Sequence, residues 1–393
     1  MNIHEFLYQV PKTDLHLHLD GSLRLSTLID LAHQQKVELP SFTEEGLLET
    51  VFKESYADLG EYLTGFGFTT KVMQDPESLE RISAELAWDC ARENVRYVEI
   101  RFAPQLHVNS RMNLEQVLCA VDNGLKKAQK EINAQLVEQG DSVLFNYGII
   151  VCAMRMFTSS FSWYSARMMN LFSESKPQEV FRLASRELVR GLIRIRDRFG
   201  LPLVGFDLAG QEDGYPAVDH REAYELAHRH FVKKTVHAGE AYGPESIFQA
   251  ITELHADRIG HGLHLYDTRL LSPKNSPHGE TYVRNLSQYL ADRRITIEIC
   301  LSSNMQTHPE MHSLREHPFG HMLEDHLSLT LCTDNRTVSR TTSTQEYVRA
   351  VETFDLNLAT LRNIVAYGFK RSFFPGSYLE KRQYVRQVLD RFD

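Results

Sequence analysis

The sequence has no run of about 18 apolar residues, so a membrane-spanning helix is not expected. Near its first residue it shows no basic segment followed by an apolar core, which a secretory signal would require. Glycine- or proline-rich linkers and repeats of about 20 to 50 residues are absent as well. These absences argue against repeat arrays and membrane partners, and they favour a soluble cytoplasmic protein.

Charge of one sign is not concentrated anywhere in the chain. The 393 residues include 43 Lys or Arg and 52 Asp or Glu, which gives a formal net charge of −9. A protein that binds a nucleic-acid polymer through its surface needs a basic face. The acidic balance therefore argues against a nucleic-acid polymer as a partner.

Cysteine is scarce, and its pattern fits neither a disulfide framework nor a thiolate metal site. The five cysteines are odd in number, widely spaced and never arranged as C-x-x-C. Three of them lie in apolar runs: Cys152, Cys300 and Cys332. We expect buried, reduced thiols, as is typical of proteins in a reducing compartment such as the cytoplasm.

The chain does contain a regular alternation of short apolar segments and longer amphipathic ones. Strands are predicted at residues 12–18, 95–103, 146–155, 203–210, 233–239, 257–263, 295–300 and 327–334. Amphipathic helices are predicted at residues 79–94, 114–136 and 177–200. Eight strand–helix repeats are typical of a (β/α)8 barrel of the TIM type, with an open, doubly wound parallel sheet as the alternative.

The chain exceeds a minimal barrel of about 250 residues by about 140 residues. We expect one domain over residues 1–393, with a helical insertion at 40–78, a polar insertion at 272–281 and extra helices after Ser339. Placed after the first strand, the segment 40–78 would lie over the barrel rim. It is interpreted either as a lid or as a packing extension.

Polar residues at the ends of the predicted strands favour the barrel, because all these ends meet at one rim. His16 and His18 are two positions apart in one strand, so both imidazoles point to the same side. His237, near the end of the fifth predicted strand, and Asp334, at the end of the eighth, complete a set of three imidazoles and one carboxylate. Such a set suits a divalent transition metal and leaves a position for water, whose pKa the metal would lower toward 7.

Two further residues at this rim fit proton transfer. Glu240 follows His237 by three residues, and burial would raise the pKa of its carboxyl so that it carries a proton to donate. His261 lies between glycines that permit close backbone approach, and it is a candidate general base. The alternatives are an exposed glutamate at a helix start and a buried histidine bonded only to backbone.

Six motifs give the chain a specific resemblance. They are KTDLHLHLDGSL, GFDLAG, VHAGE, RIGHGL, SSNMQT and CTDN. In order and spacing they resemble the adenosine deaminase family of the metal-dependent amidohydrolase superfamily, over residues 8–370. The resemblance implies a barrel enzyme with one zinc ion per chain and a purine nucleoside as its small-molecule substrate.

The resemblance also implies roles for individual residues. The implied metal ligands are His16, His18, His237 and Asp334. Among the implied catalytic groups, Glu240 donates a proton to purine N1, while His261 and Asp334 act on the attacking water. The implied substrate contacts are His18, Asp20, Gly210 and Asn335. Asp207 is expected to support the metal site, and the lack of a lysine at the end of the fourth strand favours one metal ion over two.

One position departs from the family pattern. Many members have Asp-Pro after the aspartate that ends the eighth strand, where this chain has Asn335 and Arg336. An amide donates to purine N7 at any pH, whereas a carboxylate must first be protonated. Asn335 can therefore keep the contact with N7 or serve a different purine.

The leading hypothesis is hydrolysis of adenosine to inosine and ammonia. The alternatives on the same scaffold are deamination of adenine, an N6-substituted adenosine, a nucleotide or a futalosine derivative, and metal-dependent hydrolysis of an amide or ester. A proton donor at Glu240 has no clear task with an ester. A nucleoside-binding protein without activity is disfavoured, because the ligand set and both proton-transfer residues are intact.

Overall fold

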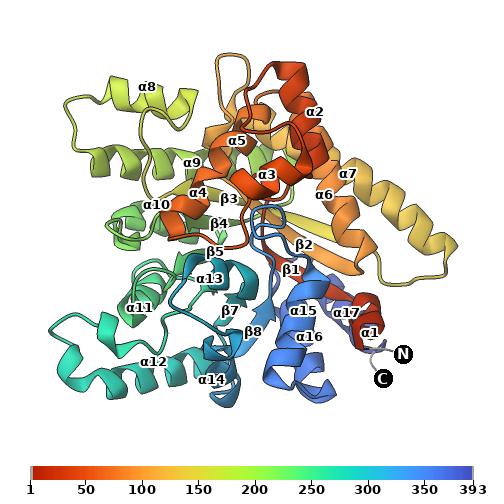
Figure 1. Ribbon diagram of the computed structural model, residues 1–393, viewed down its shortest axis with the longest axis vertical. Helices are drawn as coiled ribbons and strands as arrows, with labels where there is room; N and C mark the ends of the chain where they lie inside the picture. Colours follow the sequence, from red (N-terminus) through yellow and green to blue (C-terminus); the bar gives the residue numbers. More distant parts are fainter. Residues whose placement is uncertain (1–2, 392–393) are drawn as a thin grey trace.

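The computed structural model describes residues 3–391, and parallel strands form the centre of the molecule. Eight strands pair in chain order. They are β1 (Lys12–His18), β2 (Val95–Phe102), β3 (Asn146–Met154), β4 (Leu203–Ala209), β5 (Lys233–Ala238), β6 (Arg258–His261), β7 (Thr296–Ile299) and β8 (Ser328–Leu331). Figure 1 shows helices arranged around these strands, and the architecture confirms the predicted (β/α)8 barrel.

Contacts between the first and last strands close the barrel. Asp334, just after β8, forms a parallel bridge with Leu17 in β1. The backbone N–H of His18 donates to the carbonyl of Asp334 at 2.7 Å, and the N–H of Asp334 donates to the carbonyl of His16 at 2.8 Å. The closure therefore joins three of the predicted metal ligands directly through their backbones.

Helices connect the strands and cover the outside of the barrel (Figure 1). They are α1 (Ile3–Gln9), α2 (Leu25–Gln35), α3 (Glu44–Thr50), α4 (Leu59–Thr64), α5 (Phe66–Thr69), α6 (Pro76–Arg92), α7 (Leu114–Glu138), α8 (Trp163–Leu171), α9 (Pro177–Phe199), α10 (Arg221–Arg229), α11 (Pro244–Thr252), α12 (Gly279–Arg293), α13 (Leu301–Thr307), α14 (Phe319–Glu324), α15 (Ser343–Phe354), α16 (Leu358–Arg371) and α17 (Tyr378–Leu389). Within residues 3–391, none of these helices has the length and apolar character needed to cross a membrane.

The elements match the predicted ones closely, and their ends have local causes. The three predicted amphipathic helices are α6, α7 and α9. Gly200 ends α9 with a φ of 65°, a left-handed conformation that costs glycine nothing sterically. β6 ends two residues earlier than predicted, because His261 and Gly262 have φ of 65° and 61° and leave the extended conformation.

The cysteines behave as isolated thiols. All five are free, and the buried ones are Cys90, Cys152, Cys300 and Cys332. Burial raises the pKa of Cys152 in β3, of Cys300 just after β7 and of Cys332 just after β8, so these thiols stay protonated. The expectation of buried thiols without a disulfide is confirmed for them.

The inside of the barrel carries paired charges as well as apolar side chains. Arg101 of β2 lies 2.8 Å from Asp207 of β4 and 2.9 Å from Glu298 of β7. Arg258 of β6 lies 2.6 Å from the other oxygen of Glu298 and also pairs with Glu99. These side chains are all buried, so each charge depends on its partners for stabilisation.

Replacing Arg101 with methionine is expected to lower the free energy of unfolding by about 3–5 kcal/mol, because Asp207 then remains buried without an arginine partner and Glu298 keeps only Arg258. Urea unfolding followed by circular dichroism measures this loss. Arg81→Met removes partly exposed ion pairs to Asp30 and Glu85 and serves as the control, with an expected loss below about 1 kcal/mol. Equal losses in the two variants would contradict the importance of the buried pairs.

Candidate functional site

A cavity of about 700 Å³ opens at the carboxyl ends of the strands. The predicted site residues that line it are His18, Asp20, Gly210, His237, Glu240, His261, Asp334 and Asn335. His16 is fully buried, and its ring centroid lies 4.5 Å from that of His237. The fold therefore brings all the predicted site residues to one place.

The segment 40–78 forms part of the cavity wall. Its lining residues come from α4, α5 and the turn after them, and include Leu59, Tyr62, Phe66, Phe68 and Lys71. The hydroxyl of Tyr62 lies 2.7 Å from that of Ser339, in the loop after β8. This contact ties the segment to the rim of the barrel.

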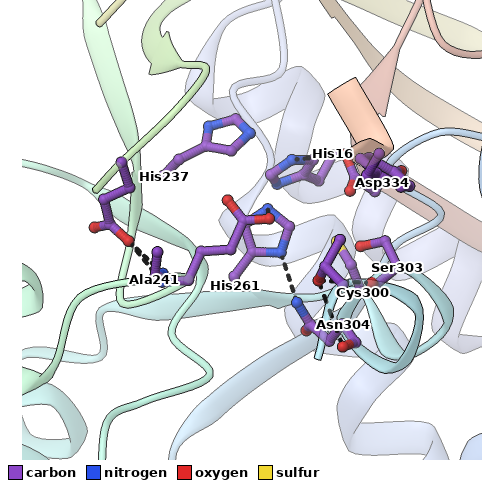
Figure 2. A network of polar contacts seen from close by, with 12 residues as sticks. His16, His237, Ala241, His261, Cys300, Ser303, Asn304 and Asp334 are labelled. Atoms are coloured by element: carbon purple, nitrogen blue, oxygen red, sulfur yellow. Dashed lines mark hydrogen bonds and ion pairs between the residues drawn. The ribbon is translucent and has the colours of Figure 1, made fainter. Parts of the chain in front are cut away.

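Four buried side chains converge at the centre of this rim. One potential ligand atom from each lies within 4.8 Å of the others, and the residues are His16, His237, His261 and Asp334. His18 adjoins two of them: its Nε2 lies 3.2 Å from Nε2 of His237 and 3.4 Å from Oδ1 of Asp334. In Figure 2 the rings of His16, His237 and His261 lie close to one another, and their planes are inclined to each other by 52 to 66°.

Carboxylates accept hydrogen bonds from Nδ1 of two of these histidines and so direct the other ring nitrogen of each toward the cluster. Nδ1 of His16 donates to Glu298 at 2.8 Å, and its buried Nε2 has no hydrogen-bond partner within residues 3–391. Nδ1 of His237 lies 3.1 Å from Asp207. A neutral imidazole that donates through Nδ1 has its lone pair at Nε2. The orphaned Nε2 of His16 and the carboxylate nearby therefore fit a divalent cation.

Burial dominates the electrostatics of Glu240. Burial, followed by the charges of Asp334 and Glu212, raises the pKa of Glu240 to about 8. The carboxyl is therefore mostly protonated at neutral pH. Its Oε1 lies 3.7 Å from Nε2 of His261, which places a proton donor beside the cluster.

Glu212, in the loop after β4, holds the segment that carries Glu240. Its carboxylate accepts the backbone N–H groups of residues 239–242 at 2.7 to 3.1 Å. The hydroxyl of Ser246 donates to it at 2.6 Å, and Arg155 lies 3.6 Å away. These contacts fix the backbone from which the side chain of Glu240 enters the site.

The sequence patterns did not identify Glu212 or Glu298 as supporting residues. Glu298 lies between two isoleucines in the short, fully buried strand β7, and a charged residue in such a strand was the available signal. Glu212 follows the GFDLAG motif by two residues, and no local spacing connects it with the VHAGE motif. Asp207, in contrast, was expected near the metal site and lies beside His237.

The predicted substrate contacts have distinct environments. Burial raises the pKa of Asp20 to about 7, and its Oδ1 has no hydrogen-bond partner in the described part of the chain. Gly210 has a φ of 95°, a conformation that favours glycine, and a Cβ there would come 3.1 Å from Met154. Nδ2 of Asn335 donates to the hydroxyl of Tyr62 at 2.7 Å, a partner that the sequence did not predict.

Arg336 is not part of the cavity wall. Its guanidinium pairs with Glu93, the residue just after α6. Its backbone N–H donates to the hydroxyl of Ser22 at 3.0 Å. The arginine at this position therefore joins the loop after β8 to the turn before β2, away from the predicted ligands.

Comparisons with known proteins agree with this geometry. The sequence profile of the family described as adenosine deaminase matches residues 11–390. An adenosine deaminase of Mycobacterium sp. (strain JLS) is 36% identical over 373 residues, which cover 94% of this chain and 92% of that protein. The crystal structure of adenine deaminase from Arthrobacter aurescens has a TM-score of 0.75 at 20% identity and covers 97% of this chain and 99% of its own. That of the Arabidopsis N6-mAMP deaminase has a TM-score of 0.72 at 25% identity and covers 98% and 99%. The chain therefore belongs to the adenosine deaminase family.

Proposed function

We propose that this protein is a hydrolase that removes the 6-amino group of adenosine and releases inosine and ammonia. A relative named adenosine deaminase that is 36% identical over 94% of the chain supports this substrate. The observation that carries the proposal is the position of Glu240, a carboxyl protonated at neutral pH, beside a buried cluster of histidines and an aspartate in one cavity.

We also propose that one zinc ion binds per chain. The proposed ligands are His16, His18, His237 and Asp334. Imidazole nitrogens with a carboxylate oxygen suit zinc, and Glu298 and Asp207 orient two of the imidazoles for it. When bound, the ion supplies the Lewis acidity that makes water nucleophilic at neutral pH.

The residues of the chain supply binding and proton transfer. When water adds to C6 of the purine, the ring accepts the electron pair only if N1 takes up a proton, and Glu240 donates it. His261 and Asp334 lie beside the attacking water. The proposed substrate contacts are His18, Asp20, Gly210 and Asn335, with the backbone N–H of Gly210 directed to a ring nitrogen and Asp20 to a ribose hydroxyl.

We further propose that residues 1–393 act as one domain in which the segment 40–78 covers the substrate. Leu59, Phe66 and Phe68 of this segment line the cavity. Apolar side chains in this position exclude water from the bound purine, which strengthens electrostatic contacts in the site.

A panel of aminopurines tests the proposed reaction. Purified protein with Zn²⁺ is supplied with adenosine, adenine, AMP and N6-methyladenosine, and formation of the 6-oxopurine product is measured, because N6-methyladenosine releases methylamine instead of ammonia. The highest kcat/KM is expected for adenosine. A higher value for another compound would reassign the substrate to that class, and no turnover across the panel in zinc-loaded protein would overturn the proposed activity.

A further inference from the structure

A chain of hydrogen bonds runs from the backbone of α14 to the ring of His261. We propose that His317 and Asn304 are positioning residues that place the single proton of neutral His261 on Nε2, so that this nitrogen donates a hydrogen bond into the site. The proposal rests on the proposed function for the identity of the substrate. The location of the proton is a property of the protein alone.

The first link fixes the proton of His317. The backbone N–H of Phe319 donates to Nδ1 of His317 at 3.1 Å. A backbone amide nitrogen can only donate, so Nδ1 must be the acceptor. Burial, followed by the charge of His308, lowers the pKa of His317 to about 3, so the ring is neutral at neutral pH. Its single proton therefore resides on Nε2.

The second link fixes the position of the proton on His261. Nε2 of His317 donates to Oδ1 of Asn304 at 3.2 Å, which turns the amide nitrogen of Asn304 toward His261. That nitrogen lies 3.1 Å from Nδ1 of His261, as the dashed line in Figure 2 marks. An amide NH2 group only donates, so Nδ1 of His261 accepts and Nε2 keeps the proton. The three side chains are at most 2% exposed, which leaves little access for competing water.

His16 and His237, two of the proposed metal ligands, have the opposite hydrogen-bond polarity at Nδ1. Behind Nδ1 of His16 lies the carboxylate of Glu298 at 2.8 Å, and behind Nδ1 of His237 lies that of Asp207 at 3.1 Å. A carboxylate accepts and so holds the proton on Nδ1, which leaves a lone pair at Nε2 for a metal. His261 has an amide donor in the equivalent place. It therefore lies near the other rings but is not a ligand through Nε2.

This tautomer changes the part that His261 takes in the reaction. In the addition step, the water oxygen bonds to C6, its proton passes to the carboxylate of Asp334, and the electron pair displaced to N1 takes the proton of Glu240. In the second step Asp334 returns its proton to the amino group, the C6–N bond breaks and ammonia leaves. Glu240 takes the proton of the new hydroxyl. His261 gains and loses no proton, and its N–H stabilises charge on the oxygen.

Nitrogen NMR of the unaltered protein tests the position of the proton. The full-length chain is labelled with ¹⁵N-histidine and measured with and without Zn²⁺, and His261 is assigned by the signals lost in His261→Gln. We expect a protonated-type shift for Nε2 and an unprotonated-type shift for Nδ1 of His261, and the opposite for His16 and His237. A proton on Nδ1 of His261 would overturn the proposal, whichever purine proves to be the substrate.

Asn304→Asp replaces the amide that donates to His261 with a carboxylate of nearly the same size. The carboxylate can only accept, so it is expected to draw the proton of His261 to Nδ1. We expect the NMR signature to reverse and kcat to fall by between about 100-fold and 1,000-fold, with KM nearly unchanged, as for removal of one donor to a reacting oxygen. An unchanged His261 signature in this variant would contradict the relay.

A matched substitution separates this effect from a general change of charge. Asn357 is the N-cap of α16, where its side chain accepts the N–H of Thr360, and aspartate caps a helix equally well. Asn357→Asp is therefore expected to leave both the His261 signals and kcat unchanged. A comparable loss of kcat in Asn357→Asp would show that the effect of Asn304→Asp is not specific to the relay.

Discussion

Glu240→Gln is expected to lower the turnover of the aminopurine by between about 100-fold and 10,000-fold, the usual contribution of a general acid. The amide keeps the size of the side chain but has no acidic proton to give to the ring. Zinc content is expected to stay the same, because Glu240 is not among the proposed ligands. Steady-state kinetics together with metal analysis of the same preparation measures both quantities.

The pH dependence of the unaltered enzyme gives an independent check on Glu240. Burial raises the pKa of its carboxyl to about 8, so the active, protonated form is present below that pH and is lost above it. We expect kcat/KM to decline as the pH rises through about 8, because kcat/KM follows the ionisation of the free enzyme. Glu253→Gln, at the partly exposed end of α11, serves as the control for the loss of one carboxylate. A variant at Glu240 with full turnover would contradict its assignment as the donor.

The parts of the site that could be predicted follow from local rules. The pairing of His16 with His18 follows from the two-residue period of a strand. Their meeting with His237 and Asp334 follows from the barrel, in which all strand ends share one rim. The alternation of strands and helices predicted a parallel sheet, and the polar residues at the strand ends favoured a barrel over an open, doubly wound sheet.

The supporting polar contacts could not be predicted, because their partners are distant in sequence and no period connects them. Glu298 is 282 residues from His16, and Asn304 is 43 residues from His261. The residues next to Glu298 and Asn304 in the sequence indicate only that a polar residue lies in or near an apolar strand. Asn335 shows the same limit: it was expected to face the purine, and the structure adds a bond to Tyr62, 273 residues away.

His18→Ala and His261→Ala are expected to separate metal binding from catalysis. Removal of a ligand should cost more than loss of an outer partner, so His18→Ala is expected to lower Zn²⁺ affinity by more than about 100-fold. His261→Ala is expected to keep its Zn²⁺ affinity and to lose most of its turnover, because Nε2 of His261 carries a proton. Competition with a chromophoric chelator on metal-free protein measures affinity, and His278→Ala, at an exposed position, is the control.

Interatomic distances alone do not show whether His18 or His261 is a metal ligand. His261 shares the 4.8 Å cluster with His16, His237 and Asp334, while His18 lies 3.2 Å from His237. Hydrogen-bond polarity distinguishes the two residues. A neutral imidazole whose Nδ1 accepts a hydrogen bond carries its proton on Nε2 and has no lone pair there for a metal. If His261→Ala lost zinc while His18→Ala kept it, the ligand set would be the four-residue cluster itself. The amide of Asn304 would then have to be reversed, and the relay from His317 would be wrong.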